Sequence, residues 1–197
     1  MTVLGLDTTG ADCSACLVRG DTVLAHISEP IGRGHAERLA PMVVEVLTAA
    51  GITPDAIDRI AVCTGPGSFT GLRVALSFAK GFALPRKIPV LGFDALSIKA
   101  AGTAGPVTVY RDVKRGQVFA ARYADPHTTL IPTAMTLDAA KTLAGADPLI
   151  EAVSADVRTL AKMAMSANPA DHPADPLYAR APDAKLPGGI TPSPQPA

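Results

Sequence analysis

One short segment combines glycines, a proline and hydroxyl groups in a pattern that could hold an anion or an acyl group. Residues 65–73 read Gly-Pro-Gly-Ser-Phe-Thr-Gly-Leu-Arg and lie between an apolar run and a helix-forming run. Glycine permits backbone angles that other residues avoid, and a hydroxyl before a helix can accept hydrogen bonds from its first free amides. Those amides also attract anions. The segment predicts either a small anion-binding turn or a tight strand-to-helix turn capped by Ser68 or Thr70.

The spacing of this loop excludes two common nucleotide-binding motifs. No Lys-Ser or Lys-Thr pair follows the last glycine, as a Walker A loop requires, and the glycines do not follow the G-x-G-x-x-G spacing of a dinucleotide site. The residues of the loop motif are Gly65, Pro66, Gly67, Ser68, Phe69, Thr70, Gly71 and Arg73.

A second candidate site is the sequence Asp-Thr-Thr-Gly at residues 7–10, which ends an apolar run. The carboxylate of Asp7 could hold a metal-bound water while the backbone of Thr8 and Thr9 faces a phosphate. A clamp of this kind needs a second glycine-containing loop opposite the first, and we find none after residue 105. These three residues therefore form either a residual nucleotide-binding site or a turn at the end of a strand.

Cysteines and histidines are too sparse to predict a metal centre. Cys13 and Cys16 have C-x-x-C spacing, but the chain has only 3 cysteines and 4 histidines, and no second pair supplies further ligands. The pair also lies within a predicted strand rather than at the start of a helix. We interpret it as two small strand residues in preference to a redox pair or a zinc half-site, and we expect no metal.

The composition indicates a globular protein with one large or two small domains. Of 197 residues 48% are hydrophobic, and 18 basic and 18 acidic residues give a net charge of zero. Proteins that bind nucleic acid unaided usually carry a basic stripe, so we expect any RNA contact to be shared with a partner. The N-terminus lacks a basic leader, and no run approaches the roughly 20 apolar residues that span a bilayer. We expect a cytoplasmic protein that does not enter membranes.

Hydrophobic periodicity and turn residues predict which elements carry these candidates. In the first hundred residues we expect strands at 2–6, 14–18, 22–28, 59–63 and 89–91 and helices at 35–50, 72–80 and 94–101. Beyond them we expect strands at 107–111, 117–124 and 148–152 and helices at 137–144 and 156–167. Three strands able to pair antiparallel, followed by alternating helices and strands, predict an α/β protein with a mixed sheet covered by helices.

The small, turn-forming residues at 102–106 suggest a boundary between two lobes. We therefore predict a first lobe over 1–102 that binds a partner and a second, reduced lobe over 103–186. The proline-rich residues 187–197 have the composition of a flexible tail.

Five segments, in order and over nearly the full length, resemble the TsaB (YeaZ) family. They are Leu4–Thr9, Gly34–Pro41, Gly65–Arg73, Arg111–Ala120 and Pro176–Lys185, of which Gly65–Arg73 is the most specific. The resemblance implies an actin/Hsp70/sugar-kinase-like fold, related to ribonuclease H, with two lobes and an abbreviated second one. It also implies a part in forming N6-threonylcarbamoyladenosine next to the anticodon of tRNAs.

In that system the resemblance assigns the chemistry to other proteins. A TsaD-like paralogue holds the metal and transfers the threonylcarbamoyl group, a TsaE-like protein supplies ATPase activity, and the TsaB-like protein is the non-catalytic partner. TsaD-like enzymes take two metal ligands from a His-x-x-x-His pair on the first helix, whereas here His35 is followed four residues later by Leu39. The alternatives are a nucleotide-binding enzyme, such as a small-molecule kinase or an acyl or phosphoryl transferase, and a glycoprotease-like activity, which we rank last.

The first two helices have broad apolar faces that predict either a docking surface or burial in the domain itself. The residues assigned to an interface are Leu39, Met42, Val43, Val46, Gly71, Leu72, Ala75, Phe78, Ala79 and Phe82. The partner would be a TsaD-like paralogue or, without one, a second copy of this chain. We expect no intrinsic cofactor, with ATP or ADP possible only at the interface with the partner. Polar contacts to the partner or to tRNA are assigned to Arg73, Lys114 and Arg115.

Overall fold

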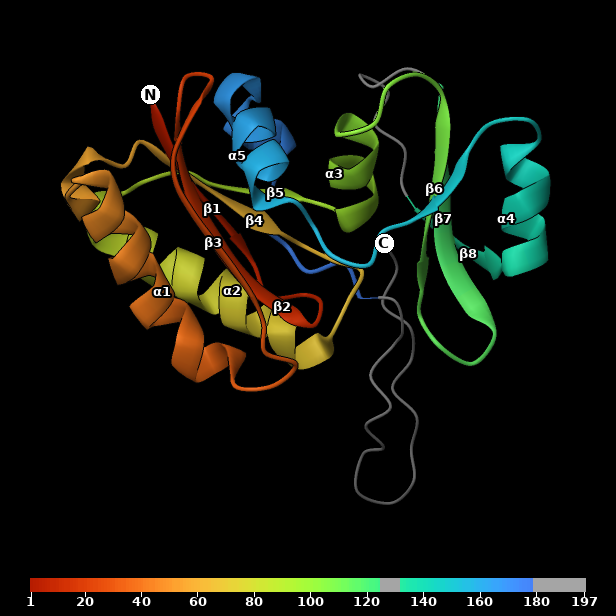
Figure 1. Cartoon of the computed structure of the whole chain (residues 1–197), viewed down its shortest axis with the longest axis horizontal. Coiled ribbons are helices and arrows are strands. Elements are labelled where there is room, and N and C mark those ends of the chain that lie inside the picture. Colours follow the sequence, from red (N-terminus) through yellow and green to blue (C-terminus); the bar gives the residue numbers. More distant parts are fainter. Residues whose placement is uncertain (125–131, 179–197) are drawn as a thin grey trace.

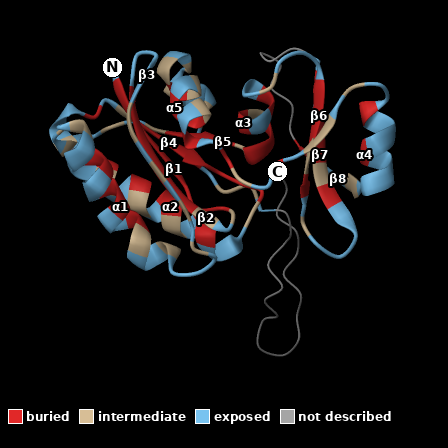
Figure 2. Ribbon diagram, in the orientation of Figure 1, coloured by how far each residue is buried: buried red, intermediate tan, exposed pale blue. Residues whose placement is uncertain are grey.

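The computed structural model describes residues 1–124 and 132–178 and contains two sheets (Figure 1). The first is five-stranded with the order β3-β2-β1-β4-β5. Its strands are β1 (Thr2–Asp7), β2 (Asp12–Arg19), β3 (Thr22–Pro30), β4 (Arg59–Cys63) and β5 (Val90–Phe93). The first three pair antiparallel, whereas β4 and β5 run parallel to β1. Every residue of β1 is buried because helices cover both faces of this sheet (Figure 2).

Alternate residues of the strands enter two different cores. Leu4 and Leu6 pack with α1 (His35–Ala50) and α2 (Phe69–Ala83) on one face of the first sheet. Val3 packs on the opposite face with α3 (Ala95–Ala101) and α5 (Val157–Ser166). Figure 1 shows α1 and α2 side by side on the side of the sheet away from α5. The period of two along a strand thus distributes side chains to two helical layers.

The second sheet is four-stranded, with the order β8-β7-β6-β9. Its strands are β6 (Val107–Asp112), β7 (Gln117–Tyr123), β8 (Thr133–Thr136) and β9 (Leu149–Glu151). On one face α4 (Leu137–Ala144) packs against β7 through Ala140 and Val118. On the other face α3 packs against β6 and β7, so that α3 lies between the two sheets (Figure 1). Short 3₁₀ helices occur at Pro54–Ala56, Leu84–Arg86 and Pro169–Asp171.

The predicted lobe boundary differs from the structure at its far end. The chain leaves the first sheet after β5 and α3, but α5 packs back on that sheet, against β1, β2 and β4. Cys16 Sγ donates to the carbonyl oxygen of Val157 at 3.0 Å, and a Cβ on Gly5 would lie 2.6 Å from the same oxygen. The amide of Leu177 donates to Thr64 O at 2.8 Å. Residues 157–178 therefore complete the first lobe rather than the second, while 179–186 and the predicted tail at 187–197 lie outside the described residues.

Most predicted elements occur within a few residues of their expected bounds. The helices at 35–50 and 137–144 and the strand at 59–63 have the predicted bounds, whereas α2 begins at Phe69, three residues earlier than expected. Strand β8 was not predicted. It has only four residues, Thr-Ala-Met-Thr, and most of them are exposed, so the strand lacks a clear apolar pattern. The mixed α/β fold class is confirmed.

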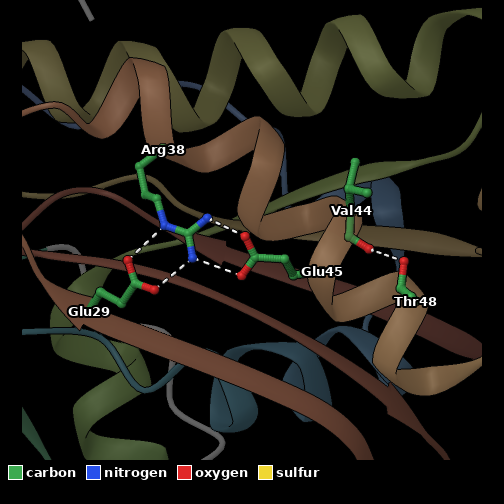
Figure 3. Close-up of polar contacts among 5 residues, drawn as sticks. All are labelled: Glu29, Arg38, Val44, Glu45 and Thr48. Carbon is green, nitrogen blue, oxygen red and sulfur yellow. Dashed lines mark hydrogen bonds and ion pairs between the residues drawn. The ribbon is translucent and has the colours of Figure 1, made fainter.

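The edge strand β3 is fastened to α1 by one arginine (Figure 3). Arg38 donates from Nε and Nη2 to the Glu29 carboxylate at 2.7 and 2.6 Å, and from Nη1 and Nη2 to the Glu45 carboxylate at 2.7 and 2.9 Å. Both carboxylates therefore bind the planar guanidinium in bidentate geometry. These hydrogen bonds hold the pKa values of Glu29 and Glu45 below their ordinary range.

The C-x-x-C pair does not converge on one site. Cys13 packs in the core under α1 and α2, whereas Cys16 packs in the core under α3 and α5, because residues three apart on a strand face opposite sides. Both thiols are free, and burial raises the pKa of Cys13 to about 11 and that of Cys16 to about 12. They are therefore small core residues with little thiolate character. Among the described helices, none has both the length and the apolar composition that crossing a membrane requires.

Candidate functional site

The predicted nucleotide-binding residues lie at the end of β1 and are buried. The exposed fractions of Asp7, Thr8 and Thr9 are 1%, 0% and 1%. The Asp7 carboxylate accepts two backbone hydrogen bonds, from the amide of Thr9 at 2.8 Å and from the amide of Ala155 at 3.2 Å. Asp7 therefore joins the strand end to the segment that leads into α5, and both of its oxygens already have donors within the chain.

Burial dominates the electrostatics of Asp7. Removal from water raises the pKa of the carboxyl above its ordinary value, although the two amides and the positive charge of Arg111 act in the opposite direction. Cys63 lies close by, with its Sγ 3.6 Å from Thr9 Oγ1, and burial raises its pKa as well. The strand end is therefore a closed, poorly solvated place rather than an open carboxylate cradle.

Arg111 is a central residue of this site that the sequence analysis did not identify. Its Nη1 donates to Ala152 O and Val153 O at 2.5 and 2.7 Å, and its Nη2 donates to Thr9 O at 3.3 Å. The side chain extends from β6 in the second sheet to the tip of β1 in the first. The available signal was its place at the head of the Arg-Asp-Val-Lys-Arg-Gly segment that supports the family resemblance. In that segment the polar contacts had been assigned to Lys114 and Arg115, which lie exposed in the β6–β7 turn.

The glycine-rich loop meets the tip of β1 directly. Ser68 is the N-cap of α2, as predicted, and its hydroxyl accepts a hydrogen bond from the amide of Gly71 at 3.2 Å. Thr70, the other predicted cap, lies exposed in the first turn of the helix. The amide of Ser68 donates to Thr9 O at 2.8 Å, and Thr8 Oγ1 donates to Gly71 O at 2.6 Å. These contacts use the amide and hydroxyl of Ser68 and the carbonyl oxygen of Gly71 within the chain, and they make the loop a capped turn that packs on the tip of β1.

Two glycines of the loop permit this close approach. A Cβ on Gly71 would lie 1.9 Å from Thr8 O, and a Cβ on Gly67 would lie 2.5 Å from Thr9 O. Gly65 instead adopts a φ of 102°, which side chains disfavour. Glycine is therefore required for two reasons. At Gly67 and Gly71 there is no space for a side chain, and at Gly65 the backbone angle disfavours one.

Beside the loop, α1 and α2 form an apolar groove with a volume of about 500 Å³. Its lining includes Ala36, Leu39, Phe69, Arg73, Val74 and Phe78. The Arg73 guanidinium lies 3.9 Å from the centre of the Phe69 ring, and the ring of Tyr178 lies 5.2 Å from that of Phe69. Phe69 is nevertheless 48% exposed. The start of α2 therefore presents an aromatic side chain and a cation at the rim of the groove.

Most of the predicted interface residues pack inside the chain. The side chains of the apolar stripes on α1 and α2 face the first sheet, which corrects the expectation that they form an exposed surface. The buried ones are Leu39, Met42, Val43, Val46, Gly71, Leu72, Ala75 and Ala79. Phe78 and Phe82 are half-buried, and Phe78 lines the groove. Any interface on these helices must use their outer side chains and the groove between them.

The position that could pair with His35 is part of the core. Leu39, one helical turn later on α1, is 1% exposed and packs with β1 and α2 residues. Within residues 1–124 and 132–178, no three His, Cys, Asp or Glu side chains lie close enough together to hold a metal ion.

Comparison with known proteins identifies the family of the chain. The family described as "TsaD: tRNA N6-adenosine threonylcarbamoyltransferase" matches residues 23–173. The tRNA threonylcarbamoyladenosine biosynthesis protein TsaB of Escherichia coli K12 is 37% identical over 62% of this chain, and the match covers 55% of that protein, so that the chain spans about half of its length. An uncharacterised protein of Mycobacterium tuberculosis H37Rv is 35% identical over 93% of this chain and 94% of its own length.

A solved structure confirms the fold. YeaZ from Pseudomonas aeruginosa superposes with a TM-score of 0.74 over 90% of this chain and 99% of that chain, at 24% identity. This likeness supports the predicted actin/Hsp70/sugar-kinase-like fold. Together with the family match and the relatives named TsaB, it shows that the chain belongs to the TsaB (YeaZ) family, within the broader group that takes its description from TsaD.

Proposed function

We propose that this chain is a non-catalytic subunit of the machinery that forms N6-threonylcarbamoyladenosine on tRNA. Its relatives in Escherichia coli and Bacillus subtilis carry that biosynthetic name, and the matching family is described by the transferase itself. The chain would bind a TsaD-type paralogue, which performs the transfer, and stabilise its active arrangement. A TsaE-type ATPase and tRNA would join through that complex, and two copies of this chain would pair by the same face when the paralogue is absent.

The observation that supports the non-catalytic role is that the polar groups at the tip of β1 are already hydrogen-bonded to other parts of the chain. The carboxylate of Asp7 is bound by two backbone amides, and the oxygen of Thr9 accepts hydrogen bonds from Ser68 and Arg111. A phosphate or metal-bound water would have to displace these contacts in a buried place, where unmade hydrogen bonds are costly. A kinase-like role for Asp7, the alternative function, is disfavoured by the same contacts.

The groove between α1 and α2 supports docking by this face. It is lined mainly by apolar and aromatic side chains, with the exposed Phe69 and the cation of Arg73 at its rim. Aromatic and arginine side chains around an apolar centre are typical of the residues that dominate binding energy at interfaces. A partner helix with an apolar face would fit such a groove.

Binding to the TsaD-type paralogue of the same organism tests this proposal. Ser77→Arg should weaken the complex at least about tenfold, because it places a large cation in the groove, as measured by calorimetry and size exclusion. Ser166→Arg is the matched control, since Ser166 is an exposed residue at the end of α5 on the opposite face of the sheet. Equal binding by both variants would contradict docking at the groove, and no complex with the unchanged chain would contradict the function.

Activity measurements separate the subunit from an enzyme. Modified tRNA nucleoside, measured by mass spectrometry, should form when the chain is added to its paralogue and the other components, and should not form when the paralogue is left out. Robust ATP turnover by the isolated chain that disappears in Asp7→Ala would instead establish the kinase-like alternative.

A further inference from the structure

A single carbonyl oxygen joins the second sheet to the start of α2. Thr9 O accepts the amide of Ser68 at 2.8 Å and Nη2 of Arg111 at 3.3 Å. Ser68 caps α2, whereas Arg111 belongs to β6, 102 residues away from Thr9 in the sequence. A carbonyl oxygen has two lone pairs and can hold both donors at once. The position of the α2 cap therefore depends on the same atom that Arg111 holds.

Arg111 connects Thr9 O to the segment that precedes α5. Its Nη1 donates to the neighbouring carbonyl oxygens of Ala152 and Val153, and the residue is 9% exposed. A Cβ on Gly10 would lie only 3.0 Å from Val153 O, so the tip of β1 already lies against this segment. The planar guanidinium thus bridges residues 9 and 152–153 in one fixed geometry, which a flexible ammonium could not reproduce.

The cap in turn determines where the rim of the groove lies. Phe69 and Thr70 follow Ser68 directly, and Arg73 packs on the Phe69 ring one turn later. Thr8 Oγ1 adds a second bond from the β1 tip to the same helical turn, at Gly71 O. Displacement of the tip would therefore move the first turn of α2 together with the aromatic side chain exposed at the groove.

We propose that Arg111 is a positioning residue for partner binding: through Thr9 O and the Ser68 cap it holds the first turn of α2, and so the groove rim, in the arrangement that the partner recognises. The partner part of this inference rests on the proposed function. Arg111 itself does not touch the groove, whose lining comes from α1 and α2. The second lobe would thereby control a binding face of the first lobe.

Hydrogen exchange on the full chain tests the link without a partner. In Arg111→Met, the amides of Ser68 and Gly71 should accelerate about tenfold more than the amides of α1 and α4, whose change measures the general loss of stability. Arg122→Met is the matched control, because Arg122 is an exposed arginine of the same sheet that pairs with Asp147 at 2.6 Å. Equal acceleration of all these regions would reflect a general loss of stability alone and would overturn the inference. Unchanged exchange at Ser68 in Arg111→Met would overturn the inference.

Partner affinity supplies the second readout. Arg111→Met should weaken binding of the TsaD-type paralogue by about tenfold, whereas Arg122→Met should bind like the unchanged chain. If Arg111→Met fails to fold, Arg111→Lys replaces it in both measurements, with the same directions expected. Faster exchange at Ser68 with unaltered partner affinity would overturn the role in binding. Failure of the unchanged chain to bind would contradict the proposed function instead and leave the exchange result to decide the link from Arg111 to the cap.

Discussion

Two arginines hold this molecule together, and they do so in opposite ways. Arg38 lies at the edge of the first sheet, where its guanidinium is bound by two carboxylates that come from nearby in the sequence (Figure 3). Arg111 lies between the lobes, where its guanidinium donates to three carbonyl oxygens from distant segments. Arg38 pairs with charged groups at the surface, whereas Arg111 supplies hydrogen-bond donors to backbone oxygens that are mostly buried.

This difference in partners and burial determines how much each arginine contributes to the stability of the tertiary structure. Exposed ion pairs contribute little net stability, because water and salt screen them. Buried carbonyl groups, by contrast, need a donor, and no water replaces one that is lost. Arg38 therefore fastens an edge strand to its neighbouring helix, whereas Arg111 fastens one lobe to the other at the point where the β1 tip meets the start of α2.

The largest predicted effect comes from adding a side chain where the tip of β1 meets α2. In Gly71→Ala the new Cβ would lie 1.9 Å from Thr8 O, so one backbone segment must move. We expect a loss of more than about 4 kcal/mol in the free energy of unfolding, measured by urea denaturation. Gly81→Ala is the control, since Gly81 is also in α2 but nothing lies within 4 Å of its added Cβ. It should gain about 0.5–1 kcal/mol from helix propensity. Equal stability of the two variants would contradict the close approach.

The second prediction compares the two arginines directly. Arg111→Met removes a donor from the carbonyl oxygens of Ala152 and Val153 and one of the two donors of Thr9 O, and should cost about 2–4 kcal/mol of unfolding free energy, with little change in 1 M salt. Arg38→Met should cost less, and its cost should shrink in 1 M salt, because the carboxylates that it frees are partly exposed. Chemical denaturation of both variants at two salt concentrations measures this. A salt-sensitive loss at Arg111 would mean that its role is ionic rather than to satisfy carbonyl oxygens.

The sequence could predict the elements that depend on local interactions. The helix over 35–50 has the predicted bounds because its apolar period and the following Gly51 lie within the segment itself. A cap at Ser68 or Thr70 was predicted for the same reason, since the Ser68 hydroxyl and the Gly71 amide from which it accepts lie only three residues apart. Motif order identified the family, because several short segments recur together.

Contacts between distant segments could not be predicted in this way. The apolar stripes of α1 and α2 were compatible with a core or with an interface, and only the packing against β1 and β2 decides for the core. The role of Arg111 could not be predicted, because nothing in the adjacent sequence indicates that Thr9 and Ala152 lie within reach of its side chain. The return of α5 to the first sheet likewise depends on space left by Gly5.

The smallest predicted effect is a difference in the sign of pH dependence. The pKa of Asp7 is raised by burial, so the folded state binds more protons than the unfolded state, and this group lowers stability as pH rises from its ordinary pKa of 3.8 through its higher folded value. The pKa values of Glu29 and Glu45 are lowered by Arg38, so their contribution is present above the ordinary pKa of 4.5 and is lost as pH falls through the folded values.

Removing each group should therefore change the stability profile in opposite directions. Asp7→Asn should remove a loss of stability that the unchanged chain shows as pH rises above 3.8. The slope of unfolding free energy against pH should therefore become more positive, by at most about 1.4 kcal/mol per pH unit for one proton. Arg38→Met should flatten the loss of stability below pH 4.5. Denaturation midpoints from pH 3 to 8 for both variants and the unchanged chain measure this. Parallel profiles for Asp7→Asn and the unchanged chain would mean that Asp7 titrates normally, and hence that the junction between the β1 tip and the second lobe is open to water.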